Sequence, residues 1–243
     1  MLTALSQGMA KDGYLQLAPV FEPAELAPII AAIHALNRLR LPPVYIYMFD
    51  QPWSLFRRLG PLIRHFLGDR HFLLPNFWAW HIPARAGACG WPVHRDNDGV
   101  TRFTDPDSGQ TLMSLSLWLP LTDATIDNGC MHVLPRSRQA AIDTQTGDRG
   151  LINQEQGLAL PARAGAVLGW AQDLYHWSGT ATARAGSPRI SLSLEFQNAG
   201  FAPMATPLLD IAAPPEFSER LALISGQIAK YRHMEDPGAP LGP

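Results

Sequence analysis

The chain has 243 residues, 47% of them hydrophobic, and a formal net charge of −2. This length and apolar content suffice for a full hydrophobic core, so we expect a single domain over residues 1–243. The small net charge gives no general attraction to nucleic acid or anionic lipid. No stretch of 18 apolar residues, secretory leader or disulfide framework is apparent, which predicts a cytoplasmic protein that does not bind membranes.

The first 70 residues or so have helical patterns. Apolar residues recur at helical spacing in residues 23–39, where a proline opens the helix, and again in about 52–67. Near the other end, residues 216–232 have the composition of one more helix. Residues 236–243 are rich in proline and glycine and predict a flexible tail.

From about residue 71 the hydrophobic period changes to two, which indicates β-strands. The expected strands are bounded by Gly, Pro, Asp or Asn. They cover residues 72–81, 112–121, 130–134, 167–171 and 189–197. Several short strands with this punctuation predict a mainly β chain folded as a sandwich or barrel.

Two of these strands have one polar and one apolar face. The polar face of the strand at 189–197 carries Arg189, Ser191, Ser193 and Glu195, and that of the strand at 112–121 carries Ser114, Ser116 and Trp118. The simplest interpretation is solvent on the polar side and core on the other. Alternatively, the helices cover the apolar faces and the polar faces line a barrel interior that holds a ligand.

His94, Asp96 and His176 are the candidate metal ligands. His94 and Asp96 are two residues apart, so in an extended strand both side chains leave the same face. Two imidazoles and one carboxylate on one side of a metal leave the opposite positions open, as in non-haem Fe(II) oxygenases. An isolated His-x-Asp pair is common by chance, and this pair indicates a metal site only together with His176 and Arg189.

The sequence around these residues resembles the phytanoyl-CoA dioxygenase family from about residue 11 to 197. The similar segments are 12–15, 21–26, 91–96, 117–137 and 176–178, together with Arg189. The resemblance implies a double-stranded β-helix, a distorted jelly roll related to the cupin fold, with the terminal helices packed on the outer sheet face. It also implies an enzyme that uses Fe(II), 2-oxoglutarate and O2, with His94, Asp96 and His176 as the metal ligands.

The same resemblance assigns residues to 2-oxoglutarate. Arg189, 13 residues after His176, matches the arginine that binds the distal carboxylate, for which a planar guanidinium offers two parallel charge-assisted hydrogen bonds. Ser178 matches a hydroxyl that donates to that carboxylate, Trp118 an aromatic beside the co-substrate, and Asn76 a polar contact on the preceding strand.

The expected reaction is hydroxylation of an unactivated C–H bond of a small molecule, with release of succinate and CO2. Related halogenases have a small residue in place of the carboxylate ligand, and Asp96 occupies that position here. Desaturation and ring closure stay open. So do two other classes of function, a metal-dependent isomerase-type activity without redox chemistry and a non-catalytic ligand-binding role. The sequence does not identify the substrate or the oligomeric state.

Other residues near the motifs have simpler explanations. Arg184 lies in a turn, His132 alternates with apolar neighbours, and His81 ends a strand, so we expect structural roles for all three. Arg95 and Arg102 are candidates to meet an anionic substrate group, and residues 97–110 form either a lid or a surface connection. The aromatic residues around the ligand strands divide between pocket and core; they are Trp78, Trp80, Trp91, Trp170, Tyr175 and Trp177.

Overall fold

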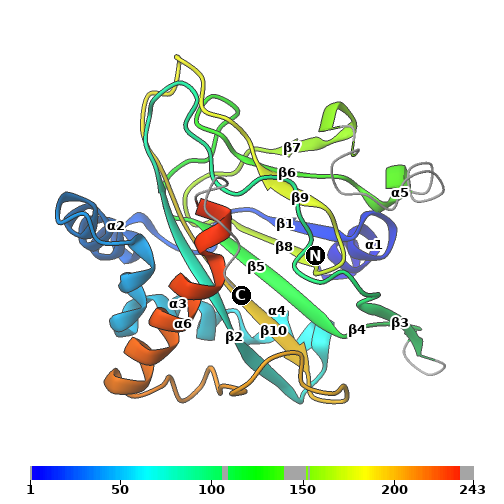
Figure 1. Ribbon diagram of the computed structural model, residues 1–243. Helices are drawn as coiled ribbons and strands as arrows, with labels where there is room; N and C mark the ends of the chain where they lie inside the picture. Colours follow the sequence, from blue (N-terminus) through cyan, green and yellow to red (C-terminus); the bar gives the residue numbers. More distant parts are fainter. Residues whose placement is uncertain (1, 106–108, 140–151, 153, 236–243) are drawn as a thin grey trace.

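The computed structural model describes residues 2–105, 109–139, 152 and 154–235 (Figure 1). Two antiparallel sheets make up its centre. The larger has the strand order β1-β8-β5-β10-β2 and the smaller β7-β6-β9. The strands of the larger sheet are β1 (Tyr14–Leu17), β2 (His71–Ile82), β5 (Ser114–Pro120), β8 (Val167–Ala171) and β10 (Arg189–Asn198). The smaller sheet contains β6 (Met131–Val133), β7 (Leu158–Leu160) and β9 (His176–Ser178).

Helices lie before, between and after the strands of these sheets. They are α1 (Leu2–Asp12), α2 (Pro23–Arg38), the 3-10 helix η1 (Pro43–Met48), α3 (Asp50–Arg58), α4 (Gly60–Leu67), α5 (Arg136–Gln139), the 3-10 helix η3 (Gln154–Gln156) and α6 (Phe217–Glu235). The chain is therefore mixed α and β rather than mainly β as predicted. The described strands form separate sheets, and no closed barrel is seen among them.

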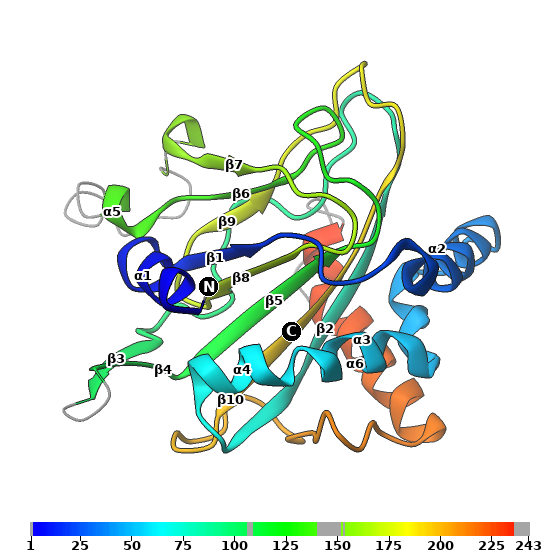
Figure 2. The same ribbon diagram turned by 180° about the vertical axis from the view of Figure 1, so that it is seen from behind.

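The two faces of the larger sheet have different roles. The apolar faces of β5 and β10 belong to one core with α2, α3 and α4, which includes Leu117, Leu194, Ile33 and Phe56. Figure 2 shows α3 and α4 in front of this face. The opposite, more polar faces point toward the smaller sheet and line a pocket that includes Ser116. The helices thus cover the apolar faces and the polar faces line a pocket, as the second interpretation expects, while a barrel interior that holds a ligand stays a prediction.

Helix α6 departs from the expectation that the terminal helices pack on the outer face. It runs along β2, the edge strand of the larger sheet, on the side seen in front in Figure 1. The Gln227 side chain accepts a hydrogen bond from the backbone N–H of Phe77 at 3.2 Å and donates to the carbonyl of Pro75. The helix thus satisfies edge groups of β2, and its last turns reach the pocket.

The element boundaries differ from the predictions in a few places. The single helix expected over 52–67 is two helices, which meet at Leu59 and Gly60 because Pro61 lacks the N–H that would continue the hydrogen-bond pattern. Helix α1 was not predicted. Part of residues 97–110 forms the hairpin of β3 (Arg102–Asp105) and β4 (Gly109–Leu112), while residues 106–108 and the predicted tail at 236–243 lie outside the described residues.

The described part of the chain contains no helix both long and apolar enough to cross a membrane. The division into one domain stays a prediction.

Candidate metal centre

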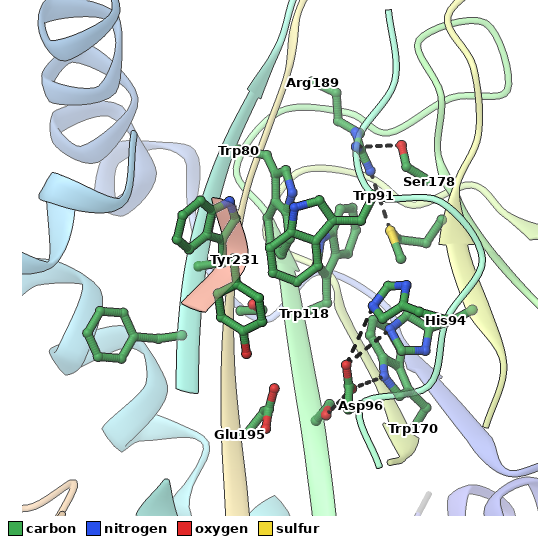
Figure 3. Close-up of a pocket in the computed structure, with 16 residues that line it drawn as sticks. Trp80, Trp91, His94, Asp96, Trp118, Trp170, Ser178, Arg189, Glu195 and Tyr231 are labelled. Atoms are coloured by element: carbon green, nitrogen blue, oxygen red, sulfur yellow. Dashed lines mark hydrogen bonds and ion pairs between the residues drawn. The ribbon is translucent and has the colours of Figure 1, made fainter. Parts of the chain in front are cut away.

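His94, Asp96 and His176 come together at one side of the pocket (Figure 3). One ligand atom from each lies within 4.8 Å of the other two. The Oδ1 atom of Asp96 is 3.6 Å from Nε2 of His94 and 3.5 Å from Nε2 of His176. The side chains are 10%, 12% and 3% exposed for Asp96, His94 and His176, so the cluster is screened from bulk water.

The backbone around His94 is not the strand that the spacing suggested. His94 instead makes an isolated antiparallel bridge to His176 in β9, with N–H to carbonyl hydrogen bonds of 3.0 Å in both directions. This bridge ties the two imidazoles together, and their ring centroids are 4.2 Å apart. The chain then turns after Arg95 so that Asp96 faces both rings.

Both imidazoles are held in the same tautomer. Nδ1 of His94 lies 2.7 Å from the carbonyl of Pro92, and Nδ1 of His176 lies 3.0 Å from the carbonyl of Leu174. A carbonyl can only accept, so Nδ1 carries the proton, and in the neutral ring Nε2 carries the lone pair that can bind a metal. Such outer contacts orient metal-binding histidines in general.

Asp96 is anchored from the opposite side. Its Oδ2 accepts hydrogen bonds from the Ser116 hydroxyl at 2.6 Å and the Trp170 indole N–H at 2.9 Å, which leaves Oδ1 toward the imidazoles. Burial alone would raise the pKa of the Asp96 carboxyl, but the attraction of the imidazoles in their protonated form, with the hydrogen bonds from His176 and Ser116, outweighs it, and the pKa lies below its usual range. Asp96 is therefore held as a carboxylate, the form that binds a metal.

Arg189 is a buried cation without a carboxylate partner among the described residues. Its side chain begins at the start of β10, is 1% exposed, and makes hydrogen bonds to Ser178 Oγ at 2.9 Å and to the Met131 sulfur at 3.5 Å. Its Nε has no partner in the described part of the chain. Burial lowers the pKa of the guanidinium to about 10, so Arg189 is still protonated at neutral pH.

The guanidinium has room for a ligand because position 90 is glycine. A Cβ at Gly90 would lie 3.1 Å from both the Arg189 NH2 group and Ser178 Oγ. Ser178 accepts from the Gly90 N–H and donates to the Gly179 carbonyl. The hydroxyl of Ser178 therefore orients Arg189 in this structure, and the predicted direct contact with 2-oxoglutarate stays a prediction.

Trp118 and Asn76, also predicted as co-substrate contacts, lie in different surroundings. The guanidinium of Arg189 is 5.6 Å from the Trp118 ring centre, and the Trp118 indole N–H is buried without a partner in the described structure. Asn76 has its amide engaged, since it donates to Glu195 at 2.9 Å and accepts from Lys230 at 2.7 Å. The structure thus brings Trp118 to Arg189 and does not bring Asn76 there.

Aromatic side chains from β2, the connection after it, β5, β8 and α6 line the pocket. Four of the six aromatic residues singled out in the sequence line it, namely Trp78, Trp80, Trp91 and Trp170. Sequence reasoning missed the role of Glu195, which it had placed on the polar face of its strand, and that of Tyr231 in α6. Burial, with repulsion from Asp96 added, raises the pKa of the Glu195 carboxyl to about 8.

The residues expected to be structural lie outside the cluster. His132 hydrogen-bonds the Cys130 carbonyl through Nδ1, His81 pairs with His34, and Arg184 forms an exposed ion pair with Asp127. The two candidate substrate arginines do not line the pocket either. The Arg95 guanidinium stacks over the Tyr175 ring at 4.5 Å, and that of Arg102 donates to the Ala10 carbonyl.

These donor groups fit a divalent metal with a bound dicarboxylate. The three candidate ligand atoms come from one side, and the Nε of Arg189 and the indole N–H of Trp118, which have no partner among the described residues, lie farther along the pocket. A buried polar group normally has a hydrogen-bond partner, so these orphaned donors indicate that a ligand belongs between them.

Comparison with solved structures finds proteins of similar fold. The chain resembles SnoN, a non-heme alpha ketoglutarate dependent epimerase from nogalamycin biosynthesis, with a TM-score of 0.58 and 18% identity over 88% of this chain and 95% of that chain. It resembles SnoK, a carbocyclase of the same type and origin, with a TM-score of 0.60 and 15% identity over 85% and 96%. HygX from Streptomyces hygroscopicus, solved with nickel and 2-oxoglutarate, gives a TM-score of 0.57 and 13% identity over 82% and 88%.

A comparison with curated proteins found no match. The model of one protein family, phytanoyl-CoA dioxygenase, matches residues 37–189, which is more than half of the chain and includes all three clustered ligands and Arg189. The chain therefore belongs to the phytanoyl-CoA dioxygenase family.

Proposed function

We propose that this protein is a non-haem Fe(II)- and 2-oxoglutarate-dependent dioxygenase that hydroxylates an unactivated C–H bond of a small molecule. One observation carries the proposal. Two imidazole nitrogens and a carboxylate oxygen face one point, and a buried arginine without a carboxylate partner in the described residues lies farther along the same pocket. This ligand set leaves adjacent metal positions for a chelating co-substrate and O2.

The residues of the chain have separate tasks in this proposal. His94, Asp96 and His176 hold iron, while Arg189 binds the distal carboxylate of 2-oxoglutarate and thereby sets its orientation. Iron and 2-oxoglutarate together supply the activation of O2, with succinate and CO2 as products. The aromatic walls keep water from the reacting atoms.

The solved relatives support the choice of iron and 2-oxoglutarate more directly than they support hydroxylation as the reaction. SnoN is an epimerase that has been solved with Fe3+, alpha ketoglutarate and nogalamycin RO, and SnoK is a carbocyclase. Asp96 as a third ligand favours hydroxylation over halogenation in this chain. We also infer that the facing sheets β1-β8-β5-β10-β2 and β7-β6-β9 are the halves of a double-stranded β-helix.

Anaerobic titration tests the proposal. Wild-type protein with Fe(II) should develop a metal-to-ligand absorption band when 2-oxoglutarate is added, and should release succinate when O2 is admitted. Asp96→Ala should lose the band. Absence of the band in wild-type protein would favour a metal-dependent isomerase-type activity or a non-catalytic binding role, since neither requires 2-oxoglutarate.

A further inference from the structure

The pocket contains a second carboxyl group, that of Glu195, for which the proposed chemistry has no use. Arg189 and Glu195 lie on the same face of β10, six residues apart, which corresponds to roughly 20 Å along a strand. The metal ligands lie beside the middle of the pocket. If Arg189 holds the co-substrate at one end, Glu195 marks the end that is left for the substrate.

Glu195 is held through one oxygen only. Its Oε2 accepts hydrogen bonds from the amides of Asn76 and Gln172, both at 2.9 Å. Lys230 donates to the amide oxygen of Asn76 at 2.7 Å and so fixes that amide with its N–H groups toward Glu195. The Oε1 atom of Glu195 has no hydrogen-bond or ion-pair partner in the described part of the chain.

The backbone is shaped to make this contact. The pairing of β10 with β2 shifts register between Leu194 and Phe196, because these residues pair with Phe77 and Leu73. The extra residues of β2 include Pro75 and Asn76, and Gln227 of α6 satisfies the backbone groups that flank Asn76. A bulge redirects a side chain, and here it accompanies the turn of Asn76 toward Glu195.

Aromatic side chains form the wall beside Glu195. Tyr231 packs against Trp91 with ring centroids 4.5 Å apart and against Trp78 at 5.4 Å. In Figure 3 the Tyr231 hydroxyl points toward Glu195. Across the sheet, Glu195 pairs with Ser116, the residue that donates to Asp96, so this polar group is next to the metal ligands.

We propose that Glu195 is the substrate-recognition residue, which offers Oε1 to a hydroxyl or amino group of a substrate whose apolar body packs on Trp78, Trp91 and Tyr231. This assignment rests on the proposed function. A structural role alone would not explain a carboxyl group in the pocket with one oxygen fixed by two amides and the other without a partner. Asp96 cannot serve in its place, because its Oδ2 accepts from Ser116 and Trp170 and its Oδ1 faces the imidazoles.

Three ligands of nearly equal shape test the assignment, namely 2-phenylethanol, 2-phenylethylamine and propylbenzene. Their dissociation constants are measured by tryptophan fluorescence under anaerobic conditions, with Fe(II) and 2-oxoglutarate bound. The proteins are the wild type, Glu195→Leu, Glu195→Gln and, as a matched control, Glu216→Gln, which changes an exposed glutamate just before α6. The absorption band of the bound co-substrate shows that each variant is folded and loaded.

At a pH above the Glu195 pKa of about 8, where the side chain is a carboxylate, wild-type protein and Glu216→Gln should bind the alcohol or the amine at least about 10-fold more tightly than propylbenzene, as expected for a hydrogen bond to a charged group. Glu195→Leu should lose this preference. Glu195→Gln separates the two substrate groups, because an amide oxygen still accepts from a hydroxyl but no longer neutralises an ammonium group.

Equal binding of the three ligands by wild-type protein would overturn the assignment, as would a preference that persists in Glu195→Leu or no saturable binding of either polar ligand. A missing absorption band in wild-type protein would instead reject the proposed function. The two failures are therefore distinguishable.

Discussion

Replacing Arg189 by methionine should separate ligand binding from stability. In the proposed complex the guanidinium meets a buried carboxylate through two charge-assisted hydrogen bonds. Removal of one partner of such a pair costs about 2–5 kcal/mol, so the dissociation constant of 2-oxoglutarate should rise roughly 30-fold to several thousand-fold. The anaerobic absorption titration with Fe(II) measures this change directly.

In the protein without metal and co-substrate, the same substitution should not weaken the fold. Arg189 is 1% exposed and has no carboxylate partner in the described residues, and its Nε has no hydrogen bond there, so the folded protein bears an uncompensated desolvation cost. Methionine has similar length and no charge. The free energy of unfolding should therefore stay equal or increase, by up to about 3 kcal/mol.

Chemical denaturation of wild type and Arg189→Met measures the second effect. Arg184→Met is the control, since Arg184 lies in an exposed ion pair with Asp127 and should change neither quantity appreciably. A variant that unfolds more easily than wild type but binds 2-oxoglutarate normally would refute the reasoning, because Arg189 would then be a structural residue.

Three further substitutions test other parts of the site and fold. Trp170→Phe removes an indole N–H from the carboxylate ligand and should weaken Fe(II) affinity about 10- to 100-fold in a metal titration, with little change in unfolding. Because the pKa of Glu195 is raised to about 8, the folded metal-free protein binds more protons than the unfolded chain between about pH 4.5 and 8, and its stability falls as pH rises through this window. Glu195→Gln should lack this loss. Chemical denaturation should therefore show a free energy of unfolding that exceeds the wild-type value by almost nothing at pH 5 and by the order of 3 kcal/mol at pH 8. A difference that does not change with pH would contradict this. Gly129→Ala should lower stability by more than about 1 kcal/mol, because φ is +79° and a Cβ would lie 2.4 Å from a backbone carbonyl oxygen, whereas Gly186→Ala, with open space around it, should be nearly neutral by the same measurement.

Periodicity in the sequence was sufficient for the long elements of the fold. The helix expected over 23–39 is α2, and the strands expected over 72–81, 167–171 and 189–197 correspond to β2, β8 and β10. These segments bury one face against a sheet or helix, so their apolar spacing records the packing. Strands of three residues, such as β7 and β9, are too short to show a period.

Only part of the candidate site could be predicted from the sequence. The cluster of His94, Asp96 and His176 was predictable because the chemistry of metal binding restricts residue types and because a family resemblance supplied their spacing; their role as metal ligands stays a prediction. Asn76 and Tyr231 show where such reasoning ends. The direction of the Asn76 side chain depends on a bulge. Tyr231 reaches the pocket from α6, a helix that packs along the edge strand β2, which is far away in sequence.

The dependence of β2 on α6 has a consequence for synthesis of the protein. Ribosomes release the amino-terminal part first, so β2 emerges long before the glutamine at position 227 that satisfies its edge. During this interval the nascent chain presents an unpaired strand that can join other polypeptides. Shielding of β2 and enclosure of the pocket by Tyr231 then occur in the same late docking event, which links protection from aggregation to acquisition of a complete binding site.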